Sequence, residues 1–170
     1  ATLGAVARYR YGNERKPWRA LQELVEYAQS LADNDPQGFR GSLADRMAAV
    51  LTLPEATPAA KTLVCGQLAE IATAKQAPVL QELLASEPRV AEAALHALER
   101  IPGSTVDRML RDALGTLEGN LKIGAVRALG TRRDRQAVET LIALLAGPDH
   151  ALAGAAADAL GRIGGDAAAR

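Results

Sequence analysis

The sequence is poor in cysteine, in aromatic residues and in net charge. Among 170 residues there is one cysteine, Cys65, so no internal disulfide can form. Aromatic residues make up 3% of the chain, and its 20 basic and 20 acidic residues cancel. This balance gives no overall field that would draw the protein to nucleic acid or to a membrane surface. No apolar run approaches the roughly 18 to 20 residues that a membrane-spanning helix needs.

Residues that carry catalysis or bind metals are equally sparse. The two histidines are His96, in the helical stretch "AALHALER", and His150, in a turn. A metal site needs three or four converging ligands, and His96 has no second ligand one turn away. No histidine or basic helix end lies near Cys65 in the sequence, which favours a buried apolar role over that of a nucleophile. No glycine-rich phosphate-binding pattern is present, so we expect neither a catalytic site nor a cofactor.

What the sequence does contain is alanine, about a fifth of all residues, and a repeated phrase. Residues 125–133 read "AVRALGTRR" and residues 156–164 read "AADALGRIG". The leucine of this phrase recurs at intervals of 30 or 31 residues, at Leu68, Leu98, Leu129 and Leu160. Alanine favours helices, and self-similarity at this period is the signature of a repeat protein.

Each phrase ends in a short polar or proline-containing turn, and a second apolar pattern follows it. The pattern has the helical spacing i, i+3, i+4 and comprises Leu80, Leu83 and Leu84, then Leu110, Ala113 and Leu114, then Leu141, Leu144 and Leu145. The repeating unit is therefore a helix, a tight turn and a second helix. First helices are predicted at about residues 56–73, 89–101, 119–131 and 149–163, and second helices at about 75–86, 104–116 and 134–146.

This array predicts an all-α fold of stacked antiparallel helix pairs, because one pair cannot bury its apolar stripe alone. Residues 54–165 form the regular repeats of about 31 residues, the last of them truncated, and residues 1–53 form less regular helices. We expect residues 1–170 to make a single domain. The side chains expected to cap second helices are Asp107, Asp134 and Asp166.

The segments "AEAALHALERIPG", "GAVRALGTRRDRQAVETLIALLAGPD" and "AGAAADALGRIGG" resemble HEAT repeats, in particular the short bacterial HEAT-like variety of the phycobilisome-lyase type. The resemblance covers residues 56–165 well and 15–53 loosely. It implies a right-handed α-solenoid whose second helices line a concave binding face, in proteins that serve as scaffolds, adaptors and enzyme subunits. Small residues in "GPDHALAGAA" stand where many such repeats carry an arginine, which argues against their inter-repeat polar ladder. Because the chain opens with Ala1 rather than Met, we expect a piece of a longer HEAT-repeat protein.

Helical geometry predicts which residues of the second helices face outward. The first leucine of each triplet points inward in this interpretation, so the residues beside it are exposed. The expected concave strip comprises Gln81, Arg108, Arg111, Glu139 and Ile142. Residues 100–135 are rich in arginine, and a candidate basic patch comprises Arg127, Arg132, Arg133 and Arg135. Both surfaces have two interpretations, an ordinary solvated surface or a site for a partner.

The aromatic residues all fall in the first quarter of the chain, and Tyr9, Tyr11 and Trp18 lie at its start. Large rings at this position either close the end of the helix stack or form a site for an aromatic ligand or a partner. The sequence does not decide between the two.

These observations favour a non-catalytic scaffold or adaptor that binds other proteins. The alternative is a nucleic-acid-binding HEAT-like protein that uses the arginines of residues 100–135. Zero net charge and the lack of aromatic residues near that patch stand against it. A subunit of a lyase-like enzyme is a weaker third possibility, for which no residue stands out. The alanine-rich last helix, residues 149–163, is expected to be the exposed end of a longer solenoid or to be covered by another chain, and to support at most weak self-association.

Overall fold

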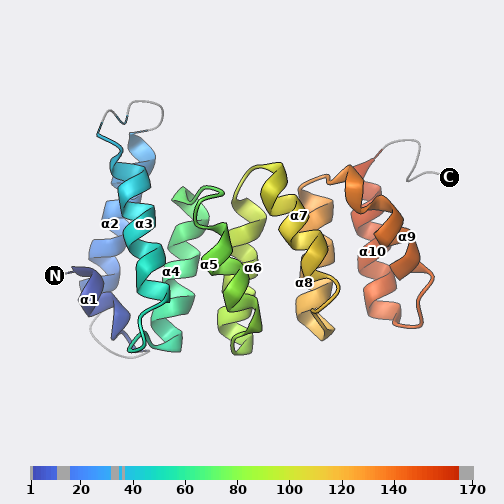
Figure 1. Ribbon diagram of the computed structural model, residues 1–170, viewed down its shortest axis with the longest axis horizontal. Helices are drawn as coiled ribbons and strands as arrows, with labels where there is room; N and C mark the ends of the chain where they lie inside the picture. Colours follow the sequence, from blue (N-terminus) through green and yellow to red (C-terminus); the bar gives the residue numbers. More distant parts are fainter. Residues whose placement is uncertain (1, 11–15, 32–34, 36, 165–170) are drawn as a thin grey trace. The chain divides into compact units, whose positions relative to one another are not determined.

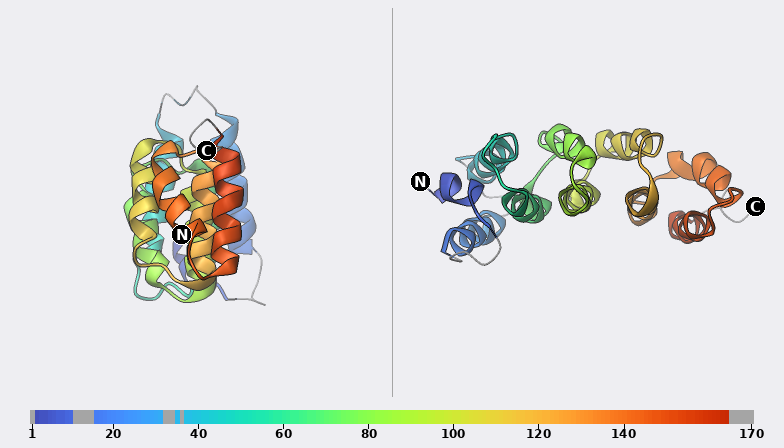
Figure 2. Two further views of the ribbon diagram at one scale, coloured as in Figure 1. Left: turned by 90° about the vertical axis from the view of Figure 1, so that its right-hand side faces the viewer. Right: turned by 90° about the horizontal axis from the view of Figure 1, so that it is seen from below.

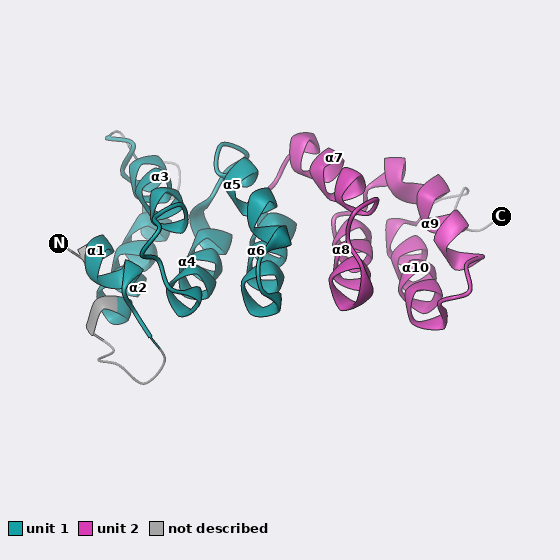
Figure 3. Cartoon of the chain, turned by 60° about the horizontal axis from the view of Figure 1, so that its bottom comes forward, with its two compact units in different colours: residues 1–101 teal, residues 102–170 magenta. Residues whose placement is uncertain are grey.

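The computed structural model describes residues 2–10, 16–31, 35 and 37–164 (Figure 1). Within these ranges every regular element is helical and no strand occurs, as the sequence predicts. The chain divides into two compact units, residues 1–101 and 102–170 (Figure 3). The assignment of residues 1–170 to a single domain stays a prediction.

Unit 1 consists of helices packed in two layers. Its helices are α1 (Thr2–Ala7), α2 (Lys16–Ser30), α3 (Phe39–Leu51), α4 (Pro58–Ile71), α5 (Ala77–Glu82) with the 3-10 turn η1 (Leu83–Ala85), and α6 (Pro88–Arg100). Figure 2 shows α2, α4 and α6 in one layer and α3 and α5 in the other. Proline stands in the first turn of α4, α5 and α6, where its missing N–H has no helical partner to lose.

Unit 2 has the same two-layer arrangement. Its helices are α7 (Ser104–Ala113), α8 (Gly119–Thr131), the 3-10 turn η2 (Arg135–Ala137) leading into α9 (Val138–Leu145), and α10 (His150–Ile163). Helices α8 and α10 lie side by side, and α9 packs on α10 (Figure 2). The first helices begin and end close to the predicted residues, whereas the second helices are shorter than predicted.

The leucines that repeat in the sequence form the core of each unit. All seven lie below the surface, namely Leu68, Leu80, Leu98, Leu110, Leu129, Leu141 and Leu160. Full burial of such a side chain contributes about 1.5–3 kcal/mol to folding. The predicted inward face of both helix sets is confirmed, and with it the all-α class of stacked helix pairs. The right hand of the stack stays a prediction.

The capping prediction holds for one aspartate and is wrong for another. Asp134 accepts a hydrogen bond from the backbone N–H of Gln136, 3.1 Å away, at the start of η2. The residue that precedes α7 is Gly103, at φ 112°, and no side chain caps this helix. Asp107 lies inside the first turn of α7 rather than before it, and its carboxylate is bound to Arg132. The third predicted cap, Asp166, lies outside the described residues.

One apolar triplet is also less buried than predicted. In α9, Leu141 is fully buried, but Leu144 is only half-buried and Leu145 is 44% exposed. Leu114, one repeat earlier, is 4% exposed. A further helix pair, α9 and α10, follows Leu114 in the chain, whereas no helix pair follows Leu145 among the described residues. The exposure of Leu145 is therefore a property of the last described pair.

Candidate functional site

A buried charged pair connects the two second helices of unit 2. Nη1 of Arg111, in α7, donates to the carboxylate of Asp134 at the turn before α9. Nη2 of Arg111 donates to Oε1 of Gln136, 2.8 Å away. The side chain of Asp134 is 6% exposed, so water reaches it poorly and the pair is little screened. The turn before α9 is thereby held against α7.

A second pair ties the end of α8 to the start of α7. Nε of Arg132 lies 2.6 Å from a carboxylate oxygen of Asp107, and its Nη2 donates to the carbonyl of Gly103 at 3.1 Å. The Arg132 side chain is 9% exposed. Removing one partner of such a pair leaves the other charge desolvated without compensation, so these residues have a structural role.

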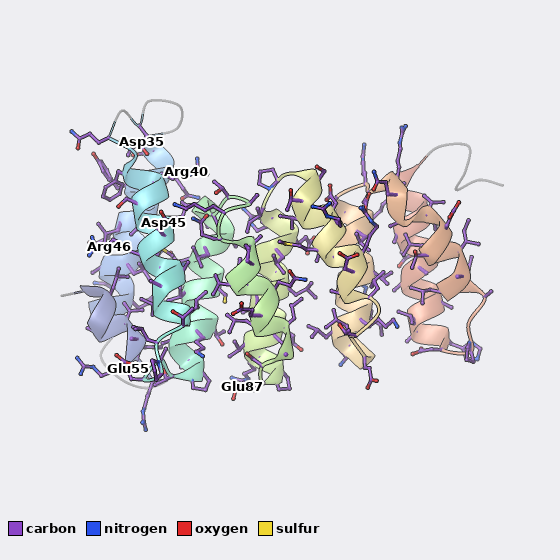
Figure 4. The ribbon with its side chains drawn as sticks, in the orientation of Figure 1. Asp35, Arg40, Asp45, Arg46, Glu55 and Glu87 are labelled. Atoms are coloured by element: carbon purple, nitrogen blue, oxygen red, sulfur yellow. The ribbon has the colours of Figure 1, made fainter. Side chains whose placement is uncertain are left out.

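Unit 1 contains a more exposed polar link, centred on Asp45 of α3 (Figure 4). Its carboxylate accepts hydrogen bonds from Nζ of Lys75 at 2.6 Å and from Nε2 of Gln76 at 2.7 Å. These two hydrogen bonds hold the pKa of Asp45 below its ordinary value of 3.8. Gln76 is buried, and its Oε1 accepts from the backbone N–H of Thr73 at 2.9 Å. The turn between α4 and α5 is therefore anchored to α3.

A polar ladder also joins consecutive first helices. In unit 1, Nη2 of Arg100 in α6 lies 3.2 Å from a carboxylate oxygen of Glu70 in α4. In unit 2, Nη1 of Arg162 in α10 donates to the hydroxyl of Thr131 in α8 at 3.2 Å. Each link spans one repeat, and it starts from the end of a helix rather than from the inter-repeat turn. The sequence prediction concerned only the residue that follows the inter-repeat turn, and these contacts involve other residues.

The residues of the predicted concave strip are distributed over both units. Gln81, in α5, is half-exposed and belongs to unit 1. In unit 2, Arg108 and Glu139 are exposed and Ile142 is 47% exposed. Arg111 instead binds Asp134 and Gln136 and is half-buried. The part of the predicted strip that lies in unit 2 thus exposes one basic, one acidic and one apolar side chain to solvent.

Only some of the four arginines of the predicted basic patch are available to a partner. Arg127, Arg133 and Arg135 are exposed, whereas Arg132 is bound to Asp107. Arg133 follows α8 in a left-handed conformation, with φ 55°. The charge available to an anionic partner is therefore smaller than the sequence suggests.

The aromatic ring that is exposed among the described residues of unit 1 is not one that the sequence singled out. Tyr9 and Trp18 are half-buried, and Tyr11 lies outside the described residues. Tyr27 is 55% exposed and meets Phe39 edge to face, with ring centroids 5.3 Å apart and an interplanar angle of 75°. The exposure of Tyr27 could have been inferred from its position between the apolar residues of the amphipathic helix α2.

The chemistry-bearing side chains offer no catalytic arrangement in the part of the chain that the structure describes. Burial raises the pKa of the Cys65 thiol from 9.0 to about 12, so almost no thiolate nucleophile forms near neutral pH. His96 and His150 are both exposed. No group of three histidine, cysteine or acidic side chains is placed to hold a metal ion among the described residues. Nor is any described helix long and apolar enough to cross a membrane.

Comparison with known proteins agrees with this arrangement. Residues 108–170 match the family model of HEAT repeats. Over these residues the chain is similar to HEAT repeats. The crystal structure of an engineered protein has a similar fold, with a TM-score of 0.51 and 21% sequence identity over 95% of this chain and 78% of its own. At that identity the likeness concerns the fold alone, and the search of curated proteins found no match.

The HEAT-repeat segment includes most of unit 2 and contains the Arg111–Asp134 pair. The family resemblance predicted from the sequence is confirmed there, as is the α-solenoid class. HEAT repeats generally mediate interactions between proteins.

Proposed function

We propose that this protein is a non-catalytic scaffold that binds another protein through the exposed side of α7 and α9. The observation that carries the proposal is the combination of Arg108, Glu139 and Ile142 on these two helices, all exposed. Protein interfaces commonly have an apolar centre with charged side chains at its rim. Arginine and large apolar residues are also the types that carry binding energy once they are desolvated.

The buried pair behind this surface supports the proposal. Arg111 and Asp134 connect α7 to the turn that starts α9. A surface whose helices are already held in place loses little conformational entropy on binding. Arg108 and Glu139 carry opposite charges, so the partner is expected to present an acidic and a basic group in complementary positions.

The same pairs weaken a nucleic-acid role. Arg111 and Arg132 are neutralised by aspartates within the unit, which leaves Arg108, Arg127, Arg133 and Arg135 of the arginines of unit 2 that were proposed to bind phosphate. Binding to duplex DNA depends on several phosphate contacts at once. We therefore assign the exposed arginines no nucleic-acid function.

The test compares two identical charge reversals on different layers of unit 2. Arg108→Glu changes a second helix, and Arg127→Glu changes a first helix. Proteins cross-linked to the wild-type chain in extracts of its source cells are identified, and the purified partner is then titrated against each variant. We expect Arg108→Glu to weaken binding at least tenfold and Arg127→Glu to change it little, about 1.4 kcal/mol separating the two.

Partner binding that is weakened more by Arg127→Glu than by Arg108→Glu would contradict the proposed surface. A protein partner that binds both variants as well as the wild-type chain would also contradict it. A duplex DNA titration at several salt concentrations serves as the control for the alternative. Affinity that falls steeply with salt and is lost with Arg127→Glu would indicate nucleic-acid binding instead.

We also infer weak self-association through the C-terminal helix pair of unit 2. Helix α10 is rich in alanine, and alanine side chains bury little area each.

A further inference from the structure

The contact between α8 and α10 shows what kind of surface these repeats use for packing. A Cβ atom added to Gly130 in α8 would lie 2.6 Å from Cα of Ala159 in α10. The two helices therefore approach backbone to backbone at this point. Such an approach is possible only where the facing residues are small.

Helix α10 repeats the glycine of this surface one repeat later and carries alanine in place of the valine, and both residues are uncovered. Val126 and Gly130 of α8 are buried, whereas the residues 31 positions further on, Ala157 and Gly161, are exposed. A Cβ atom added to Gly161 would have nothing within 4 Å. The packing surface that α8 offers to α10 thus recurs on α10 and faces solvent.

Large apolar side chains lie beside this surface on the neighbouring helix. Ile142 and Leu145 of α9 are 47% and 44% exposed, and they are two of the three large apolar residues that are exposed in the described chain. Helix α9 packs on α10 and runs antiparallel to it (Figure 2). One helix therefore presents large apolar groups and its neighbour presents a stripe of small residues.

We propose that a second copy of this chain covers this face, in a two-fold symmetric dimer. The inference rests on the self-association proposed above and specifies its geometry. A two-fold axis parallel to the helices and between α9 and α10 places α9 of one copy over α10 of the other. Ile142 and Leu145 of each copy then pack on Ala157 and Gly161 of the other. In such an isologous contact each residue pair occurs twice, and the assembly closes at two copies.

The charges at the edge of the face fit the same axis. Glu139 lies in the first turn of α9 and Arg162 in the last turn of α10, so both stand at the same end of the antiparallel pair. The axis brings Glu139 of each copy over α10 of the other, near Arg162. Packing of this face on α2 of a second copy is less favourable, because the exposed residues of α2 include Arg19, Glu23 and Glu26.

The dimer is tested by sedimentation equilibrium of the purified chain over a wide range of concentrations. We expect the mass of the wild-type chain to rise from one copy to two. Gly161→Arg adds a long charged side chain where the single copy has open space, so the variant should fold and remain monomeric. The matched control is Gly41→Arg, an exposed glycine of α3 with nothing within 4 Å of its added Cβ. This control should dimerise like the wild-type chain.

Three results would overturn the proposal. They are a wild-type chain that stays monomeric at every concentration, a Gly161→Arg variant that dimerises normally, and a wild-type mass that rises beyond two copies. Circular dichroism of the variants verifies that loss of dimer is not loss of fold. The dimer would cover Glu139 and Ile142, which also belong to the proposed scaffold surface, so partner binding is titrated at concentrations at which the chain is monomeric. Arg108→Glu then tests the scaffold surface and Gly161→Arg tests the dimer, so the two proposals can fail separately.

Disulfide cross-linking tests the direction of the axis. Glu139→Cys and Arg162→Cys are prepared as separate variants and oxidised alone and as a mixture. We expect a covalent dimer in the mixture and none from either variant alone. The buried thiol of Cys65 does not interfere, because its pKa is raised to about 12. Cross-linking of either variant with itself would overturn the proposed two-fold arrangement.

Discussion

Gly130 of α8 leaves no room for a Cβ atom against Ala159 of α10, whose own Cβ would be 2.8 Å away from it. Gly161 stands at the equivalent place in α10 and has open space around it. The same residue type, at the same position of the repeat, is required by packing in one helix and is free to change in the next. This contrast provides a direct test of the fold.

We expect Gly130→Ala to destabilise the protein by about 1–3 kcal/mol, because the added methyl group forces two backbones apart. Gly161→Ala, the control, should stabilise it by up to about 1 kcal/mol, since alanine is the better helix former. The free energy of unfolding in urea measures both. Equal effects of the two substitutions would mean that α8 and α10 do not pack as described.

Truncation of a repeated leucine tests the core. Leu129→Ala and Leu98→Ala should each lower the free energy of unfolding by about 2–5 kcal/mol, the range for a buried leucine. Leu145→Ala, at an exposed leucine, should change it by at most about 0.5 kcal/mol when the chain is dilute and monomeric. A loss below about 0.5 kcal/mol for Leu129→Ala would show that the inward face is assigned wrongly.

A double-mutant cycle can measure the coupling energy between Arg111 and Asp134. Because Asp134 is buried, Arg111→Ala and Asp134→Ala should each destabilise the protein, and the double variant should lose less than their sum. The coupling is expected at about 0.5–3 kcal/mol, the range for residues in direct contact. Arg108 is exposed on the same helix, and a cycle of Arg108→Ala with Asp134→Ala should give no coupling. Coupling of similar size in both cycles would contradict the geometry.

Because the Cys65 thiol is buried, we expect part of the free energy of unfolding to be lost at high pH. Its pKa is about 12 in the folded chain and near 9.0 when exposed, so the unfolded chain releases its proton first. This contribution is complete below pH 9 and is lost as the pH rises toward 12. The wild-type chain should therefore lose up to about 1.4 kcal/mol per pH unit more than a Cys65→Ala variant in this window. Parallel profiles of the two proteins would show that the thiol is not buried.

Much of the fold could be predicted because it depends on local periodicity. The spacing of Leu68, Leu98, Leu129 and Leu160 determines which side of each first helix is apolar, and burial follows from that. The second helices follow from their own triplets by the same reasoning. Helix ends were less predictable, since α7 ends at Ala113 where the apolar pattern continues to Leu114.

The polar contacts could not be predicted, because they depend on which residues of different helices meet. Nothing in the sequence shows that Arg132 binds Asp107, 25 residues earlier, rather than solvent. The sequence therefore assigned Asp107 to a cap and Arg132 to a basic patch. The exposure of Leu145 also depends on a neighbour, since the same position one repeat earlier is buried. Spacing within a helix gives the side that can pack but does not show whether another helix covers it.

The polar links of unit 2 have a consequence for how this part of the chain forms. They join residues only 23 to 31 positions apart, about one repeat length. Contacts between residues close in sequence are reached early by a folding chain, so unit 2 should fold quickly. In a structure held by nearest-neighbour contacts, opening starts at an end and proceeds one repeat at a time. Amide protons of α10 should accordingly exchange with solvent sooner than those of α8, and occupation of the α9–α10 face should slow them.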